Sequence, residues 1–178
     1  MSKNIILIGF MGSGKTSVAK ALHQESLYPV LDTDKLIEAQ EGCSIYDLFK
    51  TKGEAYFREQ EHALCKDLLD KESHIIATGG GFPLLPPNQD RLKDLGMIVY
   101  LDTSLPVIEE RLQEDDSRPL YQNPALFQVA FKDHPHPFKT LYYDRQPQYQ
   151  ALANFSVQTE DKTPEEIAKL IWTRYNDD

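Results

Sequence analysis

Short apolar runs alternate along the chain with longer segments in which apolar residues recur every three or four positions. The runs predict strands at Ile5–Ile8, Pro29–Leu31, His74–Thr78, Met97–Leu101 and Phe155–Gln158. Helical periodicity fills most of the gaps between them. Strands that alternate with helices are typical of a parallel sheet whose two faces are covered by helices. The pattern therefore predicts an α/β fold.

Capping signals support the predicted helices. Thr163-Pro164-Glu165-Glu166 combines an N-cap residue, a proline at the first helical position and acidic residues in the first turn. Ser44-Ile45-Tyr46-Asp47 resembles a second helix start, and Gly96 is placed to end a helix before the fourth strand.

Gln113–Pro124 does not fit the alternating pattern, because it is polar and rich in turn residues. We expect a mobile loop here, since long loops in compact domains are often lids over a site. His134–Phe138 is dense in proline, which leaves the helix before Arg145 uncertain, and its two histidines are not expected to bind a metal.

Composition and charge narrow the class of protein. The chain has 178 residues, of which 40% are hydrophobic and 26% charged, so residues 1–178 are expected to form one domain with a real core. The formal net charge is −9, and the basic residues are scattered. Because a nucleic-acid surface needs a basic stripe, we expect small anionic ligands instead.

The cysteines and the first apolar run indicate in which cellular compartment the protein is expected. Cys43 and Cys65 lie in helix-like stretches without metal-site spacing, so both are expected to be buried free thiols. Ile5–Ile8 is too short for a signal peptide or a membrane span. We therefore expect a cytoplasmic protein that does not associate with membranes. Separately, we expect a monomer.

Gly9-Phe10-Met11-Gly12-Ser13-Gly14-Lys15-Thr16 matches the phosphate-binding pattern G-x-x-x-x-G-K-[ST], after a predicted strand and before a predicted helix. Glycines allow backbone N–H groups to surround phosphate oxygens, and Lys15 can reach the β and γ phosphates. Thr16 can supply a ligand to Mg²⁺. A plain glycine turn is the alternative. The motif predicts ATP binding but does not identify the phosphate acceptor.

Asp32-Thr33-Asp34 follows the second predicted strand. The period of two of a strand would aim both carboxylates to the same side at the carboxyl end of this strand, where open α/β sheets bind ligands. One acid could hold Mg²⁺ through water, and the other could accept the proton of an acceptor hydroxyl. Either could instead cap the next helix.

A carboxylate-binding site is suggested by three separated segments. Arg58 lies in a helical stretch with Glu54 at i−4 and Glu61 at i+3, although such pairs usually mark only a solvated face. Gly79-Gly80-Gly81 follows the third strand and permits close approach of a ligand. Arg58 and a second arginine, which we assign to Arg145, could clamp a carboxylate there.

The motifs resemble the shikimate kinase family when they are taken together. The chain carries, in order, Gly9–Thr16, Asp32-Thr33-Asp34, Gly53-Glu54-x-x-Phe57-Arg58-x-x-Glu61, Gly79-Gly80-Gly81, Arg118-Pro119-Leu120 and Arg145-x-x-x-Tyr149. The resemblance implies a P-loop fold like that of nucleoside monophosphate kinases, with strand order 2-3-1-4-5. It also implies transfer of the ATP γ-phosphoryl group to the 3-hydroxyl of shikimate.

The resemblance also implies roles for individual residues. Asp34 would bind shikimate hydroxyls and serve as the base, and Glu61 would orient Arg58. Residues 33–61 would form the shikimate region and residues 113–124 the lid. Shikimate would contact Asp34, Arg58, Gly79, Gly80, Gly81 and Arg145.

On the nucleotide side, Thr16 and Asp32 would hold Mg²⁺. Arg118 in the lid would reach over the phosphates, and Arg111 and the loop ending in Pro164 would flank the adenine. Lys15 and Arg118 would act in catalysis with Asp34, and ATP would contact Gly12, Ser13, Gly14, Lys15, Thr16, Ser17, Arg111, Arg118 and Pro164.

Two positions depart from the family pattern, and two alternatives remain. Tyr121 stands where a leucine is frequent, and Phe82 where a small residue is frequent, but neither change removes a catalytic group. The chain could instead phosphorylate gluconate or a nucleoside monophosphate. It could also be a nucleotide-gated binding module without catalysis.

Overall fold

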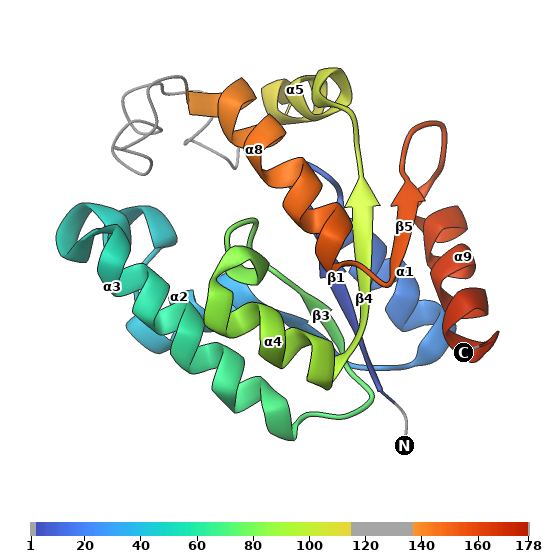
Figure 1. Ribbon diagram of the computed structural model, residues 1–178, viewed down its shortest axis with the longest axis horizontal. Helices are drawn as coiled ribbons and strands as arrows, with labels where there is room; N and C mark the ends of the chain where they lie inside the picture. The colour runs from blue at the N-terminus through green and yellow to red at the C-terminus, as the bar shows by residue number, and fades with distance from the viewer. Residues whose placement is uncertain (1–2, 115–136, 178) are drawn as a thin grey trace.

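The computed structural model describes residues 3–114 and 137–177 (Figure 1). Its strands form one parallel sheet in the order β2-β3-β1-β4-β5, which confirms the predicted order. The strands are β1 (Asn4–Ile8), β2 (Val30–Asp32), β3 (Ile75–Ala77), β4 (Gly96–Asp102) and β5 (Phe155–Gln158). Each predicted apolar run therefore became a strand, with ends shifted by no more than a residue.

Successive residues of the central strand β1 belong to different cores, because side chains alternate across a sheet. Ile5 and Leu7 pack with α1 (Lys15–Ser26) and α9 (Pro164–Asp177). Ile6 and Ile8 pack with residues of the helices on the opposite face. Figure 1 shows α1 and α9 on one side of the sheet and α4 and α8 on the other. This sandwich is the predicted α/β arrangement.

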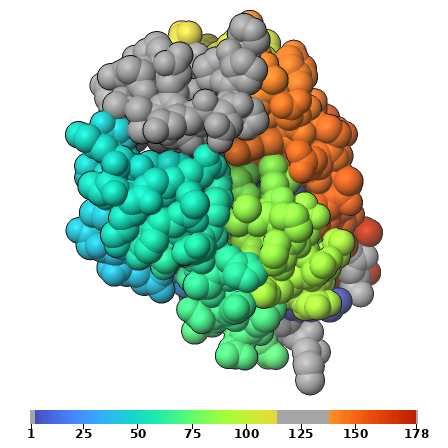
Figure 2. All heavy atoms as spheres, turned by 60° about the vertical axis from the view of Figure 1, so that its left-hand side comes forward, coloured from blue at the N-terminus to red at the C-terminus, as the bar shows by residue number. Residues whose placement is uncertain are grey.

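The second face carries more helices than the first. Its core contains residues from each α-helix that the structure describes between β2 and β5. These are α2 (Thr33–Glu41), α3 (Ile45–Asp67), α4 (Pro86–Leu95), α5 (Leu105–Glu114) and α8 (Pro137–Leu152). Two short 3₁₀ turns, η1 (Leu68–Asp70) after α3 and η2 (Phe82–Leu84) before α4, flank β3. Figure 2 shows α3, α4 and α8 side by side on this face.

The predicted helix starts are confirmed by their hydrogen bonds. The Asp47 N–H donates to Ser44 Oγ, and the Glu166 N–H donates to Thr163 Oγ1. Glu166 also accepts from the Thr163 N–H, which completes a capping box. Gly96 does end α4, but its extended φ of 169° needs no glycine. The glycine is required because a Cβ atom there would overlap the backbone of Asn4 on β1.

Some expectations need correction or lie outside the described residues. The first two residues of the predicted loop, Gln113 and Glu114, are helical because α5 extends to Glu114, and the rest of the proposed lid lies outside the described residues. Arg145 is within α8, so its helix is present despite the preceding prolines. Cys65 is buried as expected, whereas Cys43 is only partly buried; both are free thiols. Within the described ranges, no helix is long and apolar enough to cross a membrane.

Candidate functional site

The phosphate-binding loop connects β1 to α1, as its motif predicts. Gly9, Gly12 and Gly14 all have positive φ, and Gly14 is the N-cap of α1 with φ 90°. Residues with side chains rarely adopt this conformation, so the three glycines allow the loop to turn into the helix. The turn presents the amino end of α1 at the carboxyl edge of the sheet, where an anion is stabilised.

Lys15 occupies the first turn of α1, and its ammonium group lies over the loop. Its Nζ donates to the carbonyl oxygens of Gly9 and Phe10, at 2.8 Å each. It also contacts Ser13 Oγ at 3.3 Å. Ser17 lies one residue after Thr16 and is exposed on the helix. The Lys15 ammonium group, which is predicted to reach the phosphates, is therefore held at the loop by these bonds.

Thr16 and Asp32 face each other across the start of α1 and the end of β2. Thr16 Oγ1 lies 3.5 Å from Asp32 Oδ2. Asp32 Oδ1 accepts from the N–H groups of Asp34 and Lys35, so Asp32 is also the N-cap of α2. Hydroxyl and carboxylate oxygens are ligands that Mg²⁺ accepts, and the ion usually completes its shell with water and phosphate. The pair fits this role, although no cluster of three acidic, His or Cys ligands occurs among the described residues.

The strand-periodicity argument for Asp32 and Asp34 is wrong. The strand ends at Asp32 and Thr33 begins α2, so Asp34 lies in the first helical turn. Its carboxylate nevertheless reaches the glycine segment, because a Cβ atom on Gly79 would overlap Asp34 Oδ1. The Gly79 N–H donates to Thr33 Oγ1 at 2.8 Å, which ties this helix start to the segment after β3.

Arg58 lies on α3 and does not belong to a solvated helix face. Its Nη1 donates to Glu61 Oε2 at 2.6 Å, and its Nη2 donates to Glu54 Oε1 at 2.9 Å. The Glu61 side chain is only 1% exposed and that of Arg58 is 21% exposed. The spacing alone favoured the solvated alternative; burial of Glu61 supports the orienting role instead. Gly53 interrupts the helical path of α3 five residues before Arg58, with φ 83°.

Arg58 and Arg145 converge on the glycine segment from separate helices. A Cβ atom on Gly81 would lie 2.5 Å from Arg58 Nη1, and one on Gly80 would lie 3.4 Å from Arg145 Nη1. Consecutive Cα atoms are about 3.8 Å apart, so the two guanidinium groups lie against neighbouring residues. This is the arrangement that a two-arginine carboxylate clamp requires.

The charges around this clamp influence one another. Burial raises the pKa of Glu61 to about 7, although the attraction of Arg58 opposes the rise. The negative charge of Asp34 raises the Glu61 pKa further, and Arg145 lowers it. Asp34, Glu61 and both arginines therefore form one electrostatic unit.

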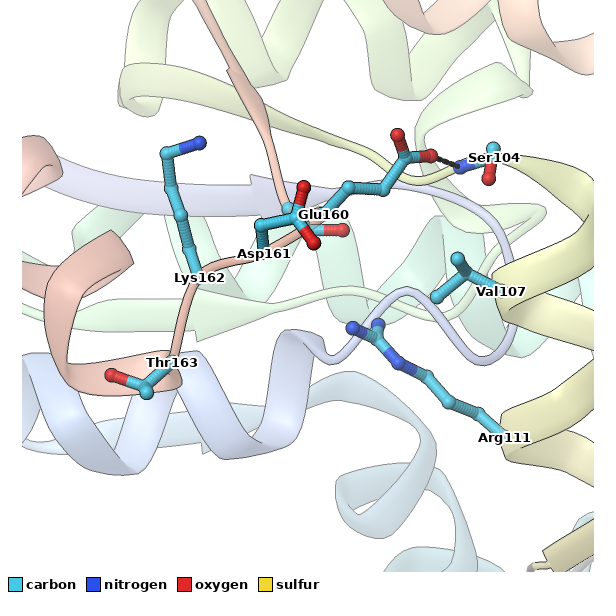
Figure 3. A pocket seen from close by; sticks show the side chains of 8 residues that line it. Ser104, Val107, Arg111, Glu160, Asp161, Lys162 and Thr163 are labelled. Carbon is cyan, nitrogen blue, oxygen red and sulfur yellow. Dashed lines mark hydrogen bonds between the residues drawn. The ribbon is translucent and has the colours of Figure 1, made fainter.

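A cavity of about 500 Å³ lies beside the phosphate-binding loop (Figure 3). Arg111 from α5 points into it and donates to the Gly12 carbonyl at 3.3 Å. Glu160 accepts from the Ser104 N–H at 3.0 Å. The Ser104 side chain, and after it this backbone bond, lowers the pKa of Glu160. The cavity is lined by Ser104, Val107, Arg111, Thr159, Glu160, Asp161, Lys162 and Thr163.

The cavity lining includes residues that the sequence did not reveal. Arg111 was predicted for the adenine side, and Pro164 immediately follows the lining residue Thr163. Glu160 lies in the loop that ends in Pro164, which was predicted for the adenine side. Ser104 and Val107 were missed, because no motif marks them in the sequence. Arg118 and Tyr121 lie outside the described residues. Phe82, the other departure, is fully buried in the core.

Comparisons with known proteins agree on one family. A family profile described as shikimate kinase matches residues 11–176. A shikimate kinase of a Sulfurihydrogenibium species is 38% identical over 97% of this chain and 97% of its own length. The shikimate kinase of Thermodesulfovibrio yellowstonii is 41% identical over 97% of this chain and 95% of its own.

Comparison with solved structures also finds shikimate kinases, and it distinguishes them from proteins that share only the fold. A shikimate kinase from Acinetobacter baumannii in complex with shikimate has a TM-score of 0.85 at 30% identity, covering 99% of this chain and 94% of its own. A gluconokinase from Sinorhizobium meliloti has a TM-score of 0.57 at 17% identity, covering 98% of this chain and 92% of its own. At that identity the second similarity indicates the fold alone.

Proposed function

The chain belongs to the shikimate kinase family, and we propose that it transfers the γ-phosphoryl group of ATP to the 3-hydroxyl of shikimate. The products would be shikimate 3-phosphate and ADP. This choice of acceptor rests on one observation: the guanidinium groups of Arg58 and Arg145 lie against the neighbouring residues Gly81 and Gly80. Shikimate has a carboxylate for such a clamp, and its hydroxyls can be bound by Asp34.

The described residues can divide the reaction between them. The shikimate oxygen attacks the γ-phosphorus, its proton passes to Asp34, and the bond between the γ-phosphorus and the β,γ-bridging oxygen breaks to release ADP. Lys15 and the amino end of α1 stabilise the charge on the phosphate oxygens. Arg58 and Arg145 hold the acceptor so that attack is oriented.

Several roles rest on the proposal and on the family resemblance. Thr16 and Asp32 would hold Mg²⁺, which would neutralise phosphate charge when bound. Arg111 and the loop before Pro164 would contact the adenine, and Arg118 would reach over the phosphates. We also propose a monomer in the cytoplasm.

The acceptor site is tested by Arg58→Ala in a coupled ADP-release assay with Mg²⁺-ATP. Loss of a charged hydrogen-bonding partner should raise the KM for shikimate by about ten-fold or more and leave the KM for ATP nearly unchanged. Lys66→Ala is a matched control, because Lys66 is an exposed cation on the same helix. Unchanged shikimate kinetics in Arg58→Ala would reject the acceptor site.

The same assay separates the alternatives when the acceptor is varied. Wild-type protein is tested in parallel with shikimate, gluconate and nucleoside monophosphates. Only shikimate should stimulate ADP release. Stimulation by gluconate or a nucleotide instead would indicate another kinase, and ATP binding without acceptor-dependent release would indicate a binding module.

A further inference from the structure

Tyr149 lies on α8 one helical turn after Arg145 and has no role in the mechanism above. Residues four apart on a helix lie on the same face, so both side chains project toward the glycine segment. The Tyr149 hydroxyl donates to the Gly80 carbonyl oxygen at 2.7 Å. The Arg145 guanidinium lies on the same side of Gly80: a Cβ atom there would lie 3.4 Å from Arg145 Nη1 and 3.6 Å from the Tyr149 hydroxyl oxygen. One buried oxygen therefore bonds the backbone of the glycine segment and lies beside the arginine proposed to bind the substrate.

The surroundings of Tyr149 fix the position of this oxygen. The residue is 1% exposed, and its ring stacks on Tyr100 of β4 with centroids 5.4 Å apart. A tyrosine has only two rotatable side-chain bonds, so packing of the ring leaves the hydroxyl little freedom. Burial raises the pKa of Tyr149 to about 12, although Arg145 and Arg58 oppose the rise. The hydroxyl consequently keeps its proton and donates it at neutral pH.

The glycine segment needs such an anchor. It contains glycines at three successive positions, and each can adopt many backbone conformations. Other bonds hold its two ends: the Gly79 N–H donates to Thr33, and the Leu84 N–H donates to the Gly81 carbonyl. The bond from Tyr149 holds the middle residue, which is the one facing Arg145.

We infer that Tyr149 is a positioning residue for acceptor binding: its hydroxyl locks the Gly80 carbonyl and the Arg145 guanidinium in the arrangement that receives the carboxylate. The inference rests on the proposed function, because it refines the geometry of that acceptor site. Tyr149 itself need not touch the substrate. Its effect passes through Arg145 and the glycine backbone.

Tyr149→Phe removes the hydroxyl and keeps the stacked ring. Because a typical hydrogen bond contributes about 1 kcal/mol, we expect the KM for shikimate to rise by about five-fold. The KM for ATP should change by less than about two-fold, since no nucleotide contact is lost. If the role of Tyr149 were purely structural, the variant would yield less folded protein, and the KM for shikimate would not rise selectively over the KM for ATP.

Tyr142→Phe provides a matched control on the same helix. Tyr142 is also buried, and its hydroxyl donates to a backbone carbonyl, that of Thr103, at 2.9 Å. The two variants lose the same group from α8, but only Tyr149 contacts Gly80. Tyr142→Phe should therefore leave the KM for shikimate unchanged, and equal increases in both variants would overturn the inference.

A double-mutant cycle with Arg145→Lys tests the path of the effect. If Tyr149 acts through Arg145, the loss from Tyr149→Phe should shrink to less than about half in the Arg145→Lys background. Fully additive losses would assign the effect to another path and overturn the inference. If wild-type protein shows no shikimate-dependent ADP release, the proposed function fails. If wild type is active and Tyr149→Phe matches it, only this inference fails.

Discussion

Gly81→Ala is expected to impair shikimate binding by displacing Arg58. Gly81 has φ −84° and ψ −22°, a conformation that alanine adopts readily, so the backbone should tolerate the change. The new Cβ atom would lie 2.5 Å from Arg58 Nη1 and 3.0 Å from its Cζ. Ordinary contacts of this kind are about 3.5 Å long, so the guanidinium must move by about 1 Å.

The expected decrease in kcat/KM follows from the hydrogen bond that this movement of Arg58 breaks. The displaced atom, Nη1, donates to buried Glu61 Oε2 at 2.6 Å. A shift of about 1 Å lengthens this bond beyond hydrogen-bonding distance. Loss of a charged hydrogen bond costs about 2 kcal/mol, which corresponds to about a thirty-fold decrease in kcat/KM for shikimate.

The assay is coupled ADP release at varied shikimate concentration, with urea unfolding as the check on folding. The same methyl group is also introduced into an Arg58→Ala background, where no guanidinium remains to be displaced. There Gly81→Ala should have less than about a three-fold effect. A thirty-fold loss in both backgrounds would show that the methyl group acts without Arg58 and would contradict displacement of the guanidinium.

Three further predictions concern the pH dependence, the nucleotide side and the sheet. Because burial raises the Glu61 pKa from 4.5 to about 7, the folded protein holds a proton that the unfolded chain loses in this range. As pH rises from 4.5 to above 7, the free energy of unfolding of the wild type should therefore fall by up to about 3 kcal/mol relative to that of Glu61→Gln. Parallel pH profiles of the two proteins in urea unfolding would contradict this. Arg111→Ala should raise the KM for ATP by about five-fold without affecting the KM for shikimate, because the guanidinium that bonds Gly12 and lines the 500 Å³ cavity is lost. An unchanged KM for ATP would indicate that the nucleotide binds elsewhere. Gly96→Ala should lower the free energy of unfolding by about 3 kcal/mol through overlap with the Asn4 backbone, and an unchanged urea midpoint would disprove the clash.

Local chemistry allowed much of the fold to be predicted from the sequence. Strand positions followed from apolar runs, and the starts at Ser44 and Thr163 followed from side chains that bond their own helix ends. The phosphate-binding loop was also predictable, because its glycines and Lys15 act within a single turn. These features depend on residues that are close along the chain.

The residues predicted for the acceptor site lie together at the glycine segment, but their geometry depends on packing. Whether Arg58 pairs with a solvated or a buried glutamate is decided by what covers Glu61, and the spacing alone favoured the wrong answer. Asp34 reaches Gly79 from a helix rather than from a strand, because Asp32 caps that helix. The partial exposure of Cys43 was likewise set by tertiary contacts.

Chemistry between neighbouring residues was enough to predict the phosphate-binding loop, the succession of strands and helices along the chain, and the residue types available to hold an acceptor. The meeting of Arg58, Gly80, Arg145 and Tyr149 depends instead on how α3, the turn after β3 and α8 pack together. Local propensities act over a few residues, whereas this site joins Tyr149 to Gly80, 69 positions away, and both to the separate helix that carries Arg58, and the packed core fixes the distances between these segments.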